Sequence, residues 1–94
     1  MAKHFVHSFR IELLPRKDQP EYSDIHLSIT TEIPKKFNYE IHSDTRHPSL
    51  EELKETLTNK LSSAMEQKSQ IDIHDYPERD YLFIDDLQMT AHKQ

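Results

Sequence analysis

The sequence contains no glycine and no cysteine among its 94 residues. Without glycine, the phosphate-binding patterns GxGxxG and Walker A and the nucleophile elbow GxSxG are absent, because each needs glycine where the backbone approaches a ligand closely or takes a positive φ. Without cysteine, disulfides, zinc–thiolate sites, iron–sulfur clusters and thiol nucleophiles are excluded. These absences remove several large classes of enzyme, and the missing disulfides indicate a cytoplasmic protein.

Long apolar runs and basic stretches are also missing. The longest strongly apolar run is Tyr81-Leu82-Phe83-Ile84, far short of the roughly 20 residues that a membrane helix needs. No apolar segment follows the first residues, so neither a secretory signal nor membrane contact is expected. The net charge is −5, and the 12 basic residues are scattered. Duplex binding normally uses a basic stripe, so nucleic-acid binding is disfavoured.

Three segments in the first half alternate apolar and polar residues, as half-buried strands do. They span residues 4–14, 22–33 and 37–42, separated by a proline-bounded loop at 15–20 and by Pro34-Lys35-Lys36. The side chains expected to face the core are Phe5, His7, Phe9, Ile11 and Leu13 in the first, Ile25, Leu27, Ile29, Thr31 and Ile33 in the second, and Phe37, Tyr39 and Ile41 in the third. This pattern predicts an antiparallel meander with one apolar and one wet face.

A helix is predicted over residues 50–67. Ser49 and Glu52 have the spacing of a capping box at its start. Apolar residues then recur at steps of three and four and form one stripe, which we expect to cover the sheet: Leu50, Leu53, Leu57, Leu61, Ala64 and Met65.

The remaining chain predicts a short strand at 71–74, a turn at 76–80 and a last strand at 81–91. The last strand is apolar on both faces, so it is expected to be central or covered on both sides. The expected fold class is α+β. One two-layer domain over residues 1–94 would contain a mostly antiparallel sheet of four to five strands, in the order β-β-β-α-β-β, with one helix on its apolar face.

The wet face of the meander is the main candidate site. If Phe9 pairs with Leu27 and Ile33 with Phe37, this face gathers Arg10, His26, Ser28, Glu40 and His42. A register slip of two residues would change the pairs but keep the common face.

The residue types on this face are compatible with two kinds of chemistry. Serine beside histidine is typical of a nucleophile–base pair, and two histidines with a glutamate are typical of a metal site. A flat sheet face, however, offers no pocket and no oxyanion hole. We therefore predict no catalytic residue, no metal ligand and no cofactor, and interpret the face as a protein-contact surface or as plain hydrated surface.

Two other histidines are weighed separately. His7 is expected to be a core or edge histidine, with a buried titrating switch as the sharper alternative. His74 lies among Asp72, Asp75, Asp85 and Asp86. Because the spacing matches neither an EF-hand nor HExxH, these residues are interpreted as an acidic rim around a hairpin.

The leading hypothesis is a small non-enzymatic protein-binding or accessory protein that self-associates. With 34% hydrophobic residues the core is lean, and free sheet edges would let another chain or a second copy pair with the domain. A second hypothesis is an acidic inhibitor that mimics nucleic acid, through Asp72, Asp75, Glu78, Asp80, Asp85 and Asp86. A third, least favoured, is a histidine-based or metal-dependent enzyme.

Overall fold

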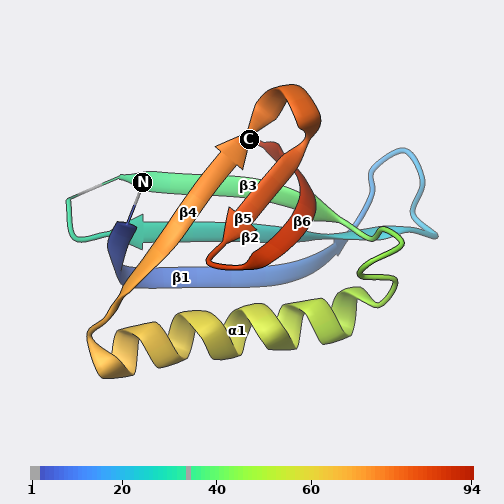
Figure 1. The fold of residues 1–94 in the computed structure, drawn as a ribbon. Coiled ribbons are helices and arrows are strands. Elements are labelled where there is room, and N and C mark those ends of the chain that lie inside the picture. Colours follow the sequence, from blue (N-terminus) through green and yellow to red (C-terminus); the bar gives the residue numbers. More distant parts are fainter. Residues whose placement is uncertain (1–2, 34) are drawn as a thin grey trace.

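Three strands precede one α-helix and three follow it in the computed structural model, which describes residues 3–33 and 35–94. Within these residues the elements are β1 (Lys3–Pro15), β2 (Ser23–Thr31), β3 (Lys36–His42), α1 (Leu50–Gln67), β4 (Gln70–Tyr76), the 3₁₀ helix η1 (Pro77–Arg79), β5 (Tyr81–Ile84) and β6 (Leu87–Lys93) (Figure 1). The α+β class and the single helix are confirmed, but the described sheet has six strands rather than four to five.

The sheet closes on itself. Every strand pair is antiparallel, and the order β1-β2-β3-β6-β5-β4 forms a barrel. The closing contact joins β1 to β4 through three residue pairs, from Lys3↔Asp72 to Phe5↔Gln70. Closure therefore pairs the two strands that would be the edges of an open sheet, and the expectation of free edges is wrong for them.

Beyond Phe5, β1 no longer pairs with β4, and α1 lies along β1 there (Figure 1). The helix packs chiefly against β1, with further contacts to β2 and β4. Its inward side chains Leu53, Leu57, Leu61 and Ala64 are buried. The strands complete the same core with Val6, Ile25, Leu27, Ile29, Phe37, Tyr39, Ile41, Ile71, Ile73, Leu82, Ile84, Met89 and Ala91.

The residues at the two ends of α1 explain where the helix begins and where it ends. At the start, Ser49 Oγ accepts a hydrogen bond from the Glu52 N–H at 3.3 Å, which confirms the predicted N-cap. At the end, Lys68 takes φ 51°, and its N–H reaches the carbonyls of Ala64 and Met65. Glycine usually occupies this left-handed position. Met65, predicted in the core stripe, is exposed because it lies at the margin of the stripe.

A β-bulge in β1 changes which of the first residues of this strand point toward the core. The pairing of β1 with β2 shifts between Val6 and Ser8, and such an inserted residue changes which side chains point inward. Val6 is consequently buried, whereas Phe5 and His7 are exposed. Of the predicted core or edge placements of His7, the core placement is therefore wrong, and so is the alternative of a buried titrating switch.

Both hairpins of the meander use registers that differ from the predicted ones. Phe9 pairs with Ile29 instead of Leu27, and Phe37 pairs with Ile29 instead of Ile33. The slips are even numbers of residues, so the side chains of β2, of β3 and of β1 beyond its bulge keep their predicted faces. β2 ends at Thr31, and Ile33 is 75% exposed instead of buried. Pro34 of the predicted connection lies outside the described residues.

The predicted last strand is two strands, β5 and β6, joined at Asp85-Asp86. Leu82 and Ile84 face the core in β5, whereas Met89 and Ala91 do so in β6. The inward positions thus change from even to odd numbers at the turn, where Asp85 has φ 54°. The buried residues on the two alternations therefore belong to two strands, and β5 is not covered on both sides, since its Tyr81 and Phe83 are only half-buried.

Candidate functional site

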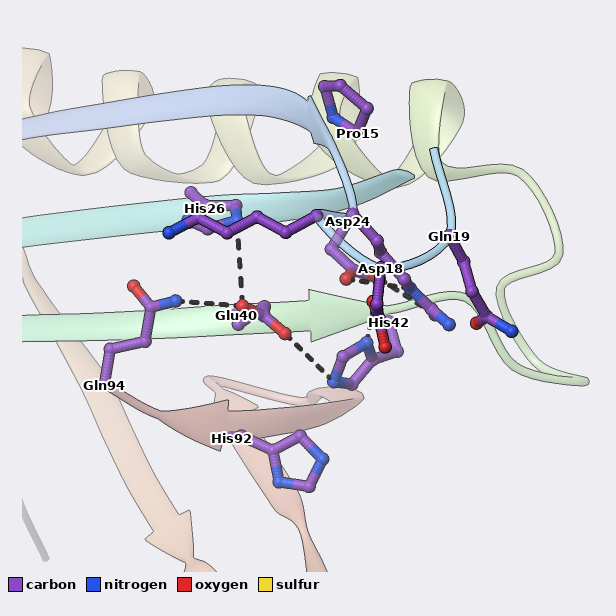
Figure 2. Close-up of a pocket in the computed structure, with 11 residues that line it drawn as sticks. Pro15, Asp18, Gln19, Asp24, His26, Glu40, His42, His92 and Gln94 are labelled. Carbon is purple, nitrogen blue, oxygen red and sulfur yellow. Dashed lines mark hydrogen bonds and ion pairs between the residues drawn. The ribbon is translucent and has the colours of Figure 1, made fainter. Parts of the chain in front are cut away.

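A polar cleft of about 600 Å³ lies on the outer face of β2 and β3. Its walls are the loop residues 15–19, side chains of the two strands and the C-terminal end of the chain (Figure 2). The strands contribute Asp24, His26, Glu40 and His42, and the C-terminal end contributes His92 and Gln94. Three of the five predicted contact residues therefore line this cleft.

Asp24 is the buried anchor of the cleft. Its side chain is 3% exposed, although it lies on the face predicted to be wet, because Arg16 and His42 cover it. Arg16 donates from Nε to Oδ2 at 3.0 Å and from Nη2 to Oδ1 at 3.1 Å. Burial by itself would raise the pKa of the Asp24 carboxyl, but the hydrogen bonds and charges of Arg16 and His42 outweigh burial and lower it.

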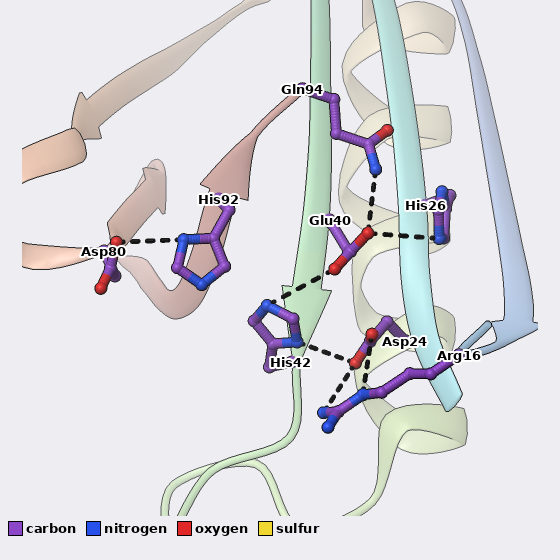
Figure 3. Close-up of polar contacts among 8 residues, drawn as sticks. All are labelled: Arg16, Asp24, His26, Glu40, His42, Asp80, His92 and Gln94. Atoms are coloured by element: carbon purple, nitrogen blue, oxygen red, sulfur yellow. Dashed lines mark hydrogen bonds and ion pairs between the residues drawn. The ribbon is translucent and has the colours of Figure 1, made fainter. Parts of the chain in front are cut away.

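Glu40 lies at the centre of the polar contacts (Figure 3). Its Oε2 accepts a hydrogen bond from Gln94 Nε2 at 3.0 Å and lies 3.8 Å from His26 Nε2. Its Oε1 lies 3.8 Å from His42 Nε2. One carboxylate thus faces the Nε2 atoms of two histidines from adjacent strands.

The orientation of His42 is fixed from its other ring nitrogen. Nδ1 lies 2.8 Å from Asp24 Oδ1, and because an ionised carboxylate only accepts hydrogen bonds, Nδ1 carries the proton. Nε2 is then the atom that faces Glu40. The ring also contacts that of His92 at 4.8 Å between centroids, and His92 Nδ1 in turn lies 3.0 Å from Asp80 Oδ1.

The other two predicted contact residues lie on the same outer face, outside the cleft lining. Arg10 pairs with Ser28 across β1 and β2, and its guanidinium forms an ion pair with Glu12. Ser28 Oγ donates to Asn38 Oδ1 at 2.8 Å. The serine hydroxyl is therefore bonded to an amide and not to His26 or His42, which is not the contact that a nucleophile–base pair requires.

Metal-ligand atoms come together in the cleft. Asp24, Glu40 and His42 each offer one such atom, and the three atoms lie within 4.8 Å of one another. Sequence alternation placed these residues on one face, but their proximity depends on the register His26↔Glu40. The predicted pairing of Ile33 with Phe37 differs from the observed register by four residues, so the approach of Asp24 to His42 was not foreseen.

His92, Gln94 and Arg16 are site residues that the sequence analysis missed. Glu40 pairs with His92 because β3 and β6 are neighbours in the barrel. The last predicted strand ended at residue 91, before both of these C-terminal residues. Arg16 reaches Asp24 because the loop between β1 and β2 folds back, with a backbone hydrogen bond from Arg16 to Tyr22 at 2.9 Å. The Pro15–Pro20 boundaries predicted a loop, but they carried no signal for its direction.

A smaller cleft of about 250 Å³ surrounds His74. His74 Nε2 lies 3.6 Å from Asp72 Oδ1, and its Nδ1 lies 3.4 Å from the Tyr76 hydroxyl. Asp85 and Phe83 complete the lining. Asp85 Oδ1 accepts a hydrogen bond from the Asp72 N–H at 2.9 Å, so this carboxylate binds the backbone of β4.

The remaining acidic residues of the C-terminal third have partners on several elements of the domain. Asp86 contacts Lys60 at 3.1 Å, and Asp80 contacts His92. Asp75 lies near Tyr39, where burial first, and then the charge and hydrogen bond of Asp75, raise the pKa of the phenol. Five of the six acids named for a nucleic-acid mimic, all except Glu78, thus have a contact with another group of the domain.

Among the described helices, none combines the length and the apolar character that crossing a membrane requires. In comparisons with known proteins, no family model, no curated protein and no solved structure matches this chain.

Proposed function

We propose that this chain is a non-enzymatic binding protein of the cytoplasm that contacts a second copy of itself through the outer face of β1, β2 and β3. The observation that supports this most is the placement of five polar side chains on that one face, beside the cleft: Arg10, His26, Ser28, Glu40 and His42. Barrel closure pairs β1 with β4, so this face, and not a sheet edge, is the surface that we propose for the contact.

The polar contacts on this face favour binding over catalysis. Ser28 donates its hydroxyl proton to Asn38, while His26 and His42 face carboxylates. A serine nucleophile needs an adjacent base and an oxyanion hole. The contact that would activate this serine is absent from the described residues.

The charges on the face suit a two-fold contact. A two-fold interface places the same patch on both partners, so the patch must complement itself. The side chain of Arg10 is 77% exposed and that of Glu12 is 35% exposed, so a basic and an acidic group lie side by side. Two copies related by an axis near Ser28 would exchange these ion pairs.

The test is the molar mass in solution, measured by light scattering after size-exclusion chromatography across a range of concentrations. Wild type is compared with Arg10→Glu and with Arg79→Glu. The control makes the same change of charge on an exposed side chain beside β5, which lies opposite β2 in the barrel order.

The proposal expects a dimer that Arg10→Glu weakens by at least about 10-fold, since like charges then face each other. Arg79→Glu should dimerise as wild type does. A wild-type chain that stays monomeric at every concentration, or equal weakening by both variants, would overturn the proposal.

A further inference from the structure

Aromatic side chains gather on the outer face of β4 and β5, outside the buried core (Figure 1). The register pairs His74 with Phe83 and Tyr76 with Tyr81, and all four side chains are half-buried or exposed. Single exposed apolar side chains are ordinary on a protein surface, but a contiguous group of them marks a binding site.

Three of these rings form walls of the smaller cleft around His74. The rings of Tyr76 and Phe83 stand nearly perpendicular, at 79° with 5.7 Å between their centroids, and His74 lies 5.9 Å from Tyr76. The face of an aromatic ring attracts a cation placed over it. Beside the cleft the chain already makes one such contact, since the Arg46 guanidinium lies 5.8 Å from the centre of the Tyr81 ring.

The charged groups of the cleft are acidic. The five described residues that line it include Asp72 and Asp85 but no lysine or arginine. Asp85 Oδ1 accepts a backbone hydrogen bond, and Asp72 Oδ1 is buried with no hydrogen-bond partner among the described residues. One oxygen of each carboxylate is thus occupied or enclosed, so the cleft offers a ligand chiefly negative charge and ring faces.

We propose that this cleft binds a methylated ammonium group, as found in a small quaternary ammonium compound or in a trimethylated lysine side chain. An unmethylated ammonium is strongly hydrated and carries three N–H donors that need acceptors. Methylation of the nitrogen removes these donors and keeps the charge, and aromatic walls recognise such groups in proteins. Tyr76 and Phe83 contact the methyl groups, while Asp72 and Asp85 supply the opposite charge.

The test is a titration followed by NMR at about pH 8, above the range in which imidazoles ordinarily carry a proton. One probe is choline, compared with its neutral analogue in which carbon replaces the quaternary nitrogen. The other is a short peptide with one trimethyllysine, compared with the same peptide carrying unmodified lysine. The amide resonances of the protein give each Kd, and the methyl resonances of the methylated probes report ring contact by moving upfield.

The variants change one ring and one charge of the cleft. Tyr76→Leu removes the ring face, Tyr76→Phe keeps it, and Asp72→Asn removes the charge. The matched controls are Tyr22→Leu and Asp18→Asn, which make the same changes on exposed side chains of the loop between β1 and β2.

Wild type, Tyr76→Phe and both controls should bind a methylated probe, with its methyl resonances moving upfield. Tyr76→Leu and Asp72→Asn should each weaken binding by about 3- to 30-fold, the range that cation–π contacts span. The uncharged and unmethylated probes should bind at least about 10-fold more weakly than their methylated, charged counterparts. Tighter binding of the peptide would assign the ligand to a partner protein, and tighter binding of choline would assign it to a small molecule; both results support the site.

Three results would overturn the proposal: no binding of either methylated probe to wild type, equal binding of the neutral analogue, or unchanged affinity in both Tyr76→Leu and Asp72→Asn. The proposal does not depend on self-association, because the cleft lies on β4 and β5 and the proposed contact between copies uses β1, β2 and β3. A monomer that binds choline through these residues would therefore support this site and refute self-association.

Discussion

Arg16 binds Asp24 through two parallel hydrogen bonds, so the loop between β1 and β2 is joined to the first residues of β2 by a charged pair. Paired hydrogen bonds of this kind are stronger than neutral ones. The pair also fixes one wall of the cleft.

Asp24→Ala should therefore lower the free energy of unfolding by about 1–3 kcal/mol, because donors on Arg16 and His42 lose their acceptor. Urea denaturation measures the change. Asp18→Ala, in the exposed part of the same loop, should stay within about 0.5 kcal/mol of wild type. Equal effects of the two substitutions would show that the pair contributes nothing specific.

The stability of the domain should fall in acid, in part through Asp44. Burial opposes ionisation of Asp44, but hydrogen bonds from the Thr90 hydroxyl and from the N–H groups of His47 and Arg46 outweigh it and lower the pKa of Asp44. A carboxyl whose pKa is lower in the folded state stabilises the fold above its unfolded pKa, about 3.9. That stabilisation disappears as the pH falls through the folded pKa.

The urea midpoint should accordingly be constant from neutral pH down to about pH 5 and then decrease toward pH 3. Asp44→Asn should be less stable than wild type at pH 7 and lose less of its remaining stability on acidification. If the variant falls as steeply as wild type between pH 5 and pH 3, Asp44 is not one of the groups responsible.

The left-handed residue at the end of α1 offers a stabilising substitution. Lys68 has φ 51° and ψ 41°, a conformation that costs about 1–2 kcal/mol for a residue with a Cβ. Lys68→Gly removes this cost but increases the freedom of the unfolded chain. We expect a net gain of about 0.5–1 kcal/mol, measured by thermal unfolding. Lys54→Gly inside the helix should instead destabilise by about 1 kcal/mol, and a loss in both would refute the assigned backbone geometry.

Asp85 combines a left-handed backbone with a structural hydrogen bond. It has φ 54°, and its carboxylate accepts from the Asp72 N–H. Asp85→Ala should cost about 1–3 kcal/mol, since the hydrogen bond is lost and alanine tolerates this φ poorly. Asp85→Gly should cost less than Asp85→Ala, because only the hydrogen bond is lost. Chemical denaturation of the two variants gives the order, and the reverse order would contradict this account.

The sequence analysis predicted which side chains of an element point inward better than it predicted which elements lie side by side. Ile25, Leu27 and Ile29 point inward as their alternation indicated, and Ser49 caps α1. Period and capping are local properties, so they can be read from consecutive residues. Which strand lies beside which is decided by the closure of the barrel, for which the sequence contains no local signal.

For the candidate site, too, the shared face of the residues was predicted but their contacts were not. His26, Glu40 and His42 were correctly placed on one outer face, because residues two apart on a strand share a face. Their actual contacts required a hairpin register that alternation leaves undetermined within even steps. In the last predicted strand the turn was hidden from the pattern, because Tyr81, Phe83 and Leu87 share the odd-numbered positions of Met89 and Ala91.

The three residue pairs between β1 and β4 that close the barrel join segments from opposite parts of the chain. Forming such a contact requires most of the intervening chain to be ordered first, whereas the hairpins β1–β2, β2–β3 and β5–β6 need only short loops. Folding should therefore begin in the hairpins and finish at the seam. Destabilising substitutions at the seam would then act mainly on the rate of unfolding, and those in the hairpins mainly on the rate of folding.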